Sequence, residues 1–170
     1  RGTIGTDGTS GWDGNIFGGG QGDGSNYTSG RVGGNTTVEM TNGTVLGNIY
    51  GGGRLALTGI DMNGTMQDGA THGHTKVMVK GGTVGNVAEI ESFTWFSMGN
   101  IYGGGKGYLD TDHPNLNDAE KSLLLGLTKN TTIEVSDTLG NNTHVYGIIL
   151  GGGEINRRSE ERRVGKECRS

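Results

Sequence analysis

The sequence predicts an all-β protein, a right-handed parallel β-helix (β-solenoid) fragment with one short inserted helix. Three observations support this prediction. Glycine supplies 37 of the 170 residues, or about 22%, whereas typical proteins contain about 7% glycine. A glycine-rich motif recurs four times, and strand-like segments recur before it in a fixed order. Hydrophobic residues make up only 30% of the chain, which is too little for the single large core of a helical bundle or doubly wound domain.

The clearest repeat is the motif Gly-Asn-Ile-Tyr-Gly-Gly-Gly. It occupies residues 47–53 and 99–105, and it occurs with Phe in place of Tyr at 14–20. A fourth, degenerate copy at 147–153 has Ile148 in place of Asn and Leu150 in place of Tyr. A Gly-Thr-Val or Gly-Thr-Ile segment precedes it, and a strand-like segment with alternating apolar residues comes earlier still. Repeats in one order and direction favour parallel coils, in which each copy is stable only against its neighbours.

The strand-like segments at 36–40, 75–79 and 131–135 alternate with a period of two, which is typical of half-buried strands. Superposing them predicts which side chains stack, about 4.8 Å apart. The predicted inward ladders are Thr36/Thr75/Thr131, Val38/Val77/Ile133 and Met40/Val79/Val135, and the outward ladders are Thr37/Lys76/Thr132 and Glu39/Met78/Glu134.

The triple-glycine runs are predicted to be corners of the solenoid, where glycine can adopt positive φ without strain. Asn42-Gly43 and Gly81-Gly82 mark a shorter corner between strand segments. The alternative interpretation, a phosphate-binding loop, is disfavoured because no Lys-Ser or Lys-Thr pair follows any run and no helical pattern begins there.

The chain divides into a solenoid over 1–157, with copies near 1–20, 36–53, 75–105 and 131–153, and a tail over 158–170. The tail is dense in charge and contains the only cysteine, Cys168. It resembles the in-frame translation of a widely used DNA-sequencing adapter, so we expect it to be a non-native artefact. The solenoid itself then has no thiol for a disulfide or a cysteine-ligated zinc site.

The repeated motifs, over nearly all of residues 1–156, resemble the glycine-rich repeats of large secreted or surface-exposed proteins from gut-dwelling anaerobic bacteria. The resemblance implies a β-solenoid shaft with an adhesin-like role, located outside the cell or on the bacterial surface. It implies no known reaction. The worn fourth motif and the uneven spacing of the copies depart from the pattern.

Insertions interrupt the repeats where binding residues could lie. The segments 6–13 and 86–98 separate a Gly-Thr-Val/Ile segment from the next Gly-Asn-Ile motif, and both should project from one edge. They carry the candidate ligand-binding residues Trp12, Phe93, Trp95 and Phe96. The alternative is that these rings cover an end or flank of the solenoid.

A further insertion over 108–127 predicts a short helix at 118–126. Asn117 and Glu120 have the spacing of a capping box, and Ala119, Leu123 and Leu127 share one helical stripe. We expect this stripe to pack against the side of the solenoid, with a partner-binding groove as the alternative.

The sequence contains few patterns that indicate a catalytic or metal site. His72 and His74 lack a third ligand at a recognisable spacing. Glu39 and Glu134 are predicted to lie about 9.6 Å apart, slightly beyond the roughly 6.5–9.5 Å of an inverting glycosidase pair. We therefore expect no enzyme activity, no metal and no cofactor.

The charge and hydropathy patterns argue against nucleic-acid partners and against a membrane-spanning segment. The formal net charge of −4 lacks the basic footprint of a nucleic-acid-binding protein, and no run of 18 apolar residues is present to span a membrane. We expect a structural or adhesive segment of a surface or secreted protein, whose loops bind host or bacterial glycans or surface proteins. The alternatives are a polysaccharide-cleaving β-helix enzyme, either a lyase or a glycoside hydrolase, and a simple spacer.

Overall fold

A computed structural model describes residues 2–6, 13–23, 26, 28–60, 65, 68, 70–86, 98–107, 117, 126–137, 140 and 142–154. Within these residues the chain forms short strands and turns. The strands are β1 (Thr3–Ile4), β2 (Ile16–Phe17), β3 (Thr36–Met40), β4 (Thr44–Val45), β5 (Ile49–Tyr50), β6 (His74–Val79), β7 (Thr83–Val84), β8 (Ile101–Tyr102), β9 (Asn130–Val135), β10 (His144–Val145) and β11 (Ile149–Leu150).

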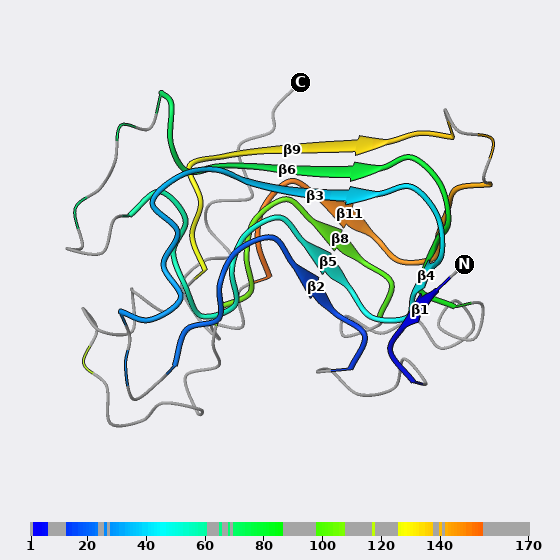
Figure 1. The fold of residues 1–170 in the computed structure, drawn as a ribbon, viewed down its shortest axis with the longest axis horizontal. Helices are drawn as coiled ribbons and strands as arrows, with labels where there is room; N and C mark the ends of the chain where they lie inside the picture. The colour runs from blue at the N-terminus through cyan, green and yellow to red at the C-terminus, as the bar shows by residue number, and fades with distance from the viewer. Residues whose placement is uncertain are drawn as a thin grey trace, which may run out of the picture.

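The strands form three parallel sheets. The long-strand sheet has the order β3-β6-β9, the Thr-Val sheet β1-β4-β7-β10, and the Ile-Tyr sheet β2-β5-β8-β11. Along the chain one strand from each sheet follows in turn, so we number the coils as coil 1 (β1, β2), coil 2 (β3–β5), coil 3 (β6–β8) and coil 4 (β9–β11). Figure 1 shows β3, β6 and β9 side by side in one layer, and β2, β5, β8 and β11 side by side in another. This arrangement is compatible with a parallel β-solenoid.

The register of the long-strand sheet confirms the predicted ladders. Val38 pairs with Val77 and Val77 with Ile133, while Glu39, Met78 and Glu134 form one outward row. In β3 the burial alternates residue by residue, with Thr36, Val38 and Met40 inside. Val135 pairs with Val79 in the predicted ladder. It is nevertheless 40% exposed, because none of the described strands stacks beyond β9.

The core is a thin column of aliphatic side chains drawn from all three sheets. The long-strand sheet contributes Val38, Val77 and Val79, the Thr-Val sheet Val45 and Val84, and the Ile-Tyr sheet Ile49 and Ile101. All seven are at most 8% exposed. Such a column grows by one layer per coil, which explains how a chain with so little apolar content can still bury a continuous interior.

The triple-glycine runs are corners, as predicted, but the predicted reason is wrong. None of their glycines has positive φ, whereas Gly43 and Gly82 at the shorter corner do, at 96° and 98°. In the runs the requirement is space between coils. A Cβ on Gly18, Gly51 or Gly103 would meet the carbonyl oxygen of the first glycine in the next run. Gly51 N donates to Tyr102 O at 2.9 Å, so the backbones approach too closely for any side chain.

Two sets of buried and half-buried polar side chains reinforce the coils. Thr36, Thr75 and Thr131 each donate a hydroxyl hydrogen bond of 2.5 Å to the carbonyl of Gly51, Gly103 or Gly151 in the same coil. Each bond ties the start of a coil to its last corner.

An asparagine ladder links successive coils. Asn15 Oδ1 accepts from Asn48 N at 2.7 Å, and Asn48 Oδ1 accepts from Asn100 N at 2.8 Å. Asn100 Oδ1 then accepts from Ile148 N at 2.9 Å. Because Ile148 has no side-chain amide, it cannot accept a further bond of this kind, and the ladder ends at coil 4. Buried polar groups that are fully paired in this way favour one register over its neighbours.

The predicted helix at 118–126 falls outside the described residues except for Gly126, and the tail at 158–170 lies entirely outside them. The fourth Thr-Val strand, β10, was not predicted, since His144 stands where the other copies have threonine. His144 pairs with Thr83, so β10 has the same register as the other strands of the Thr-Val sheet.

Substituting alanine at Gly51 should lower the free energy of unfolding by about 1–3 kcal/mol, as overpacking does in a close-packed interior. The new methyl group would collide with Gly103 O and crowd Thr75 Cβ at 3.0 Å. Urea denaturation measures the change. The matched control is Gly34→Ala, where a Cβ meets nothing within 4 Å, and it should change stability by less than about 0.5 kcal/mol. Equal effects at the two positions would contradict the packing explanation.

Candidate functional site

The four candidate ligand-binding residues, Trp12, Phe93, Trp95 and Phe96, lie outside the described residues. The structure does describe the points at which their insertions join the stacked coils. The first insertion begins after Gly5 and ends before Gly14, and the second begins after Gly85 and ends before Gly99. The candidate site is therefore built from these attachment points upward.

Each insertion is entered and left through a pair of glycines in the left-handed region. Gly5 and Gly14 have φ of 101° and 77°, and Gly85 and Gly99 have φ of 84° and 88°. The two members of a pair almost touch, because a Cβ on Gly99 would lie 2.7 Å from Gly85 Cα. Positive φ and this close approach both exclude other residues. The insertion thus leaves the coil and returns to it at one point.

The two attachment points lie on the same corner of the stacked coils. Gly47 N donates to Gly14 O at 3.2 Å, and Gly99 N donates to Gly47 O at 3.1 Å. Gly14, Gly47 and Gly99 are therefore stacked, with coil 2 between the two insertions. Coil 2 has no insertion, since Leu46 runs directly into Gly47. The spacing of two coils sets the attachment points about 9.6 Å apart.

The bases of both insertions are held by side chains. At the first, Asp13 Oδ2 accepts hydrogen bonds from Thr6 N at 2.5 Å and from Thr6 Oγ1 at 2.6 Å. At the second, Met98 is only 5% exposed and its Sδ lies 3.8 Å from Asn48 Nδ2. Each loop therefore starts from a fixed base.

The two outward glutamates do not form a carboxylate pair. Lys80 Nζ lies 2.6 Å from Glu39 Oε1, and Lys76 Nζ lies 2.8 Å from Glu134 Oε1. Met78 lies between the glutamates in the ladder. Each carboxylate is exposed and bound to its own lysine, an arrangement that solubilises a sheet face and contributes little to stability.

The two histidines, His72 and His74, have different contacts. His72 Nδ1 lies 2.7 Å from Thr71 Oγ1, while His74 begins β6 and pairs with Asn130. In the part of the chain that the structure describes, no group of three or more His, Cys, Asp or Glu side chains is placed to hold a metal ion.

The structure also reveals a polar cluster that sequence reasoning missed. The residue after each triple-glycine run joins a parallel ladder, Gln21–Arg54–Lys106–Glu154. Lys106 Nζ lies 3.2 Å from Glu154 Oε1, with the two side chains only 14% and 19% exposed. In the sequence these four residues share one position, directly after a triple-glycine run, and this shared position could have identified the ladder.

This ladder meets a stack of aromatic rings. Phe17, Tyr50 and Tyr102 lie nearly parallel, with centroids 4.6 and 4.9 Å apart. Tyr50 is fully buried; its hydroxyl donates to Glu154 Oε2 and accepts from Asn48 Nδ2 at 3.2 Å. Burial, and secondarily the charge of Glu154, raises the pKa of both Tyr50 and Tyr102 above the usual 10.0. These phenols are structural groups held neutral.

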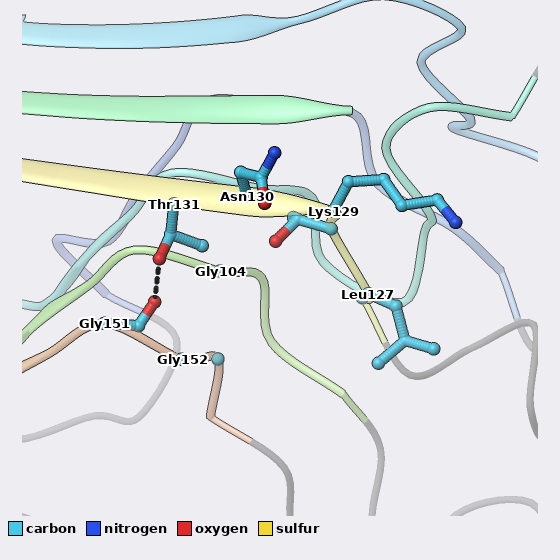
Figure 2. A pocket seen from close by; sticks show the side chains of 10 residues that line it. Gly104, Leu127, Lys129, Asn130, Thr131, Gly151 and Gly152 are labelled. Atoms are coloured by element: carbon cyan, nitrogen blue, oxygen red, sulfur yellow. Dashed lines mark hydrogen bonds between the residues drawn. The ribbon is translucent and has the colours of Figure 1, made fainter. Parts of the chain in front are cut away.

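A cavity of about 480 Å³ lies at the coil 4 end, between residues 126–131 and the glycines at 104 and 151–153. Figure 2 shows Thr131 bridging to Gly151 across it, with the Lys129 side chain directed away from that pair. Its lining is largely glycine and backbone and includes no carboxylate or imidazole. Lys129 is the titratable residue among its lining residues.

Comparison with known proteins gives no match to a family model, to a curated protein or to a solved structure. Across the described residues, no helix has the length and apolar character needed to cross a membrane. The functional argument therefore depends on the geometry of the insertions and of the scaffold that holds them.

The buried tyrosines predict a loss of stability at high pH. In the folded state Tyr50 stays neutral, whereas in the unfolded chain it ionises above about pH 10.0. Its contribution is fully present below that pH. Above it, stability falls by about 1.4 kcal/mol per pH unit for each such tyrosine.

The substitution Tyr50→Phe should reduce that slope by about one tyrosine's share. Urea denaturation between about pH 9 and 11, one unit on either side of the unfolded-state pKa of 10.0, measures the change. At neutral pH the variant should be destabilised by about 1–3 kcal/mol, because Glu154 loses a buried donor. An unchanged slope would mean that Tyr50 is accessible to hydroxide in the folded state.

Proposed function

We propose that this chain is part of a right-handed parallel β-helix that serves as a structural shaft in a surface-exposed or secreted protein, and that it displays loops which bind glycans or proteins. The observation that carries the proposal is the stacking of two glycine-bounded loop bases on one corner, with a single coil between them. The resemblance to glycine-rich bacterial surface repeats supports the same location and role.

The right-handed winding is inferred from strand chirality. Consecutive parallel strands of one sheet are joined by right-handed crossovers in about 98% of cases, because right-twisted strands return to the sheet most easily that way. Here every pair within a sheet is parallel, and each return passes through the other two sheets.

The stiffness of the scaffold supports a display role. Successive coils are joined by backbone hydrogen bonds in three sheets, by the asparagine ladder and by the aromatic stack. Loops on a rigid scaffold can present side chains at fixed positions, which lowers the entropy lost on binding. Trp12 and Trp95 would supply flat apolar faces for sugar rings or partner side chains.

The competing function is cleavage of a polysaccharide by outward carboxylates. This function is disfavoured because Glu39 and Glu134 each form an ion pair with a separate lysine. The two functions differ in a direct way, because display predicts binding without turnover and depends on the tryptophans rather than on the glutamates.

Binding should be lost when the second insertion is removed. Deleting residues 86–98 with Gly85→Leu reproduces the uninterrupted Leu46-Gly47 junction of coil 2 and should leave the strand signal in circular dichroism intact. On an array of plant, bacterial and mucin-type polysaccharides, this variant and Trp95→Ala should each lose at least about tenfold in affinity, as central aromatic contacts do.

Thr132→Ala is the control, since Thr132 is exposed on the outward face of β9, in a sheet that contains neither attachment point; its binding should be unchanged. Binding that survives both loop variants would contradict the display proposal, and the absence of any binding on the array would contradict the display of glycan-binding loops. Release of oligosaccharides that stops in Glu39→Gln or Glu134→Gln would instead support the enzyme.

A further inference from the structure

Large exposed apolar side chains are concentrated at the two ends of the stack. Among the described residues, five such side chains are exposed, and four of them belong to coil 4 or lead into it: Leu127, Val135, Ile149 and Leu150. The fifth, Ile4, lies on β1 at the opposite end. The sides of the stack carry none of the five.

The coil 4 residues occupy ladder positions that are buried in the inner coils. Ile149 is 49% exposed, whereas Ile49 and Ile101 in the same ladder are fully buried. Leu150 continues the ladder of the buried Tyr50 and Tyr102. The end of coil 4 is therefore a cross-section of the core.

The last glycine run gives an independent indication. Gly18, Gly51 and Gly103 are glycines because the next run lies directly against them. A Cβ on Gly151 would approach only Thr131 Oγ1, at 3.8 Å, and one on Gly152 would meet no described atom within 4 Å. Neither has positive φ. Their lack of side chains has no explanation within the described residues, but it leaves space for another coil.

The opposite end presents the matching surface. The edge strands there are β1 and β2, with Ile4 46% exposed and Ile16 and Phe17 half-buried. Gly18 follows β2, so this end also has a run without side chains where the backbones would meet.

We propose that the coil 4 end binds the coil 1 end of a second copy of this chain, head to tail. Strand β10 then pairs with β1 of the second copy and β11 with β2, repeating the register of Thr3 with Thr44 and of Ile16 with Ile49. This interaction is separate from the display function and does not depend on it.

The charges at the junction are compatible with this contact. Glu154 ends the ladder that begins with Gln21 and continues to Arg54. In a head-to-tail pair, Glu154 would therefore lie beside Gln21 of the second copy, with Arg54 one coil further, and this described ladder would oppose no like charges.

The junction should be weaker than the contacts within the chain. Coil 1 has no described strand in the long-strand sheet, so the contact completes two sheets and leaves the edge of β9 uncovered. Ile148 also has no side-chain amide with which to extend the asparagine ladder across the junction. Association should consequently be reversible and dependent on concentration.

A disulfide test reads the register directly. Thr3 and His144 begin and end one ladder, so within a chain their Cα atoms lie three strand spacings apart, about 14 Å. A disulfide requires about 4.4–6.8 Å. Across the proposed junction the same residues are adjacent. In a Cys168→Ser background, Thr3→Cys with His144→Cys should therefore give a series of covalent dimers and larger oligomers under mild oxidation.

The matched control is Thr3→Cys with Glu134→Cys, which places the second thiol on an exposed position of the long-strand sheet. It should give only the cross-linking seen with each single variant. Cross-linking of the Thr3–His144 pair no greater than this control would overturn the proposal.

Sedimentation measures the association without new thiols. The average mass of the Cys168→Ser chain should rise with concentration, and Ile149→Lys should raise the dissociation constant at least about tenfold, because it places a charge in the apolar junction. Thr37→Lys, on the outward face of β3, should leave it unchanged. A chain that stays monomeric at every concentration, or oligomers that Ile149→Lys does not weaken, would overturn the head-to-tail contact.

Discussion

The structure depends on the close approach of backbones at the triple-glycine corners. The same bond recurs at each step: Gly18, Gly51 and Gly103 each donate an amide hydrogen bond of 2.9 Å to a carbonyl one coil further on. At this separation a single Cβ would collide with the next coil. Because the corner fixes both the spacing and the register of the coils, the valine, isoleucine and tyrosine ladders align over one another without needing a large core.

Polar side chains add specificity to this frame. The threonine hydroxyls close individual coils, whereas the asparagine amides join one coil to the next. A slip of one residue would turn the whole apolar face outward and would leave these buried groups without partners. The frame in turn fixes where the insertions begin, since Gly14 and Gly99 are stacked through Gly47. The regular scaffold thus sets a defined separation between the two points at which the insertions are attached.

The sequence was most informative where a residue's role repeats. Val38, Val77 and Ile133 share a pattern with period two, and their register could be predicted without coordinates. The role of the glycine runs could not, because a backbone contact between coils leaves the same signature as a positive-φ turn. His144 was missed since it shares no side-chain chemistry with Thr44 or Thr83 and is placed only by backbone pairing. For Trp12 and Trp95 the prediction stays a prediction.

The central claim is that equivalent segments lie one over another around a shared apolar column. Methyl-methyl nuclear Overhauser effects in a selectively labelled sample test it most directly. The account predicts cross-peaks between Val38 and Val77 and between Val77 and Ile133, whose strands are direct neighbours, and none between Val38 and Ile133, which lie about 9.6 Å apart across two strand spacings. Missing cross-peaks for the neighbouring pairs, or a strong one between Val38 and Ile133, would contradict the stacking.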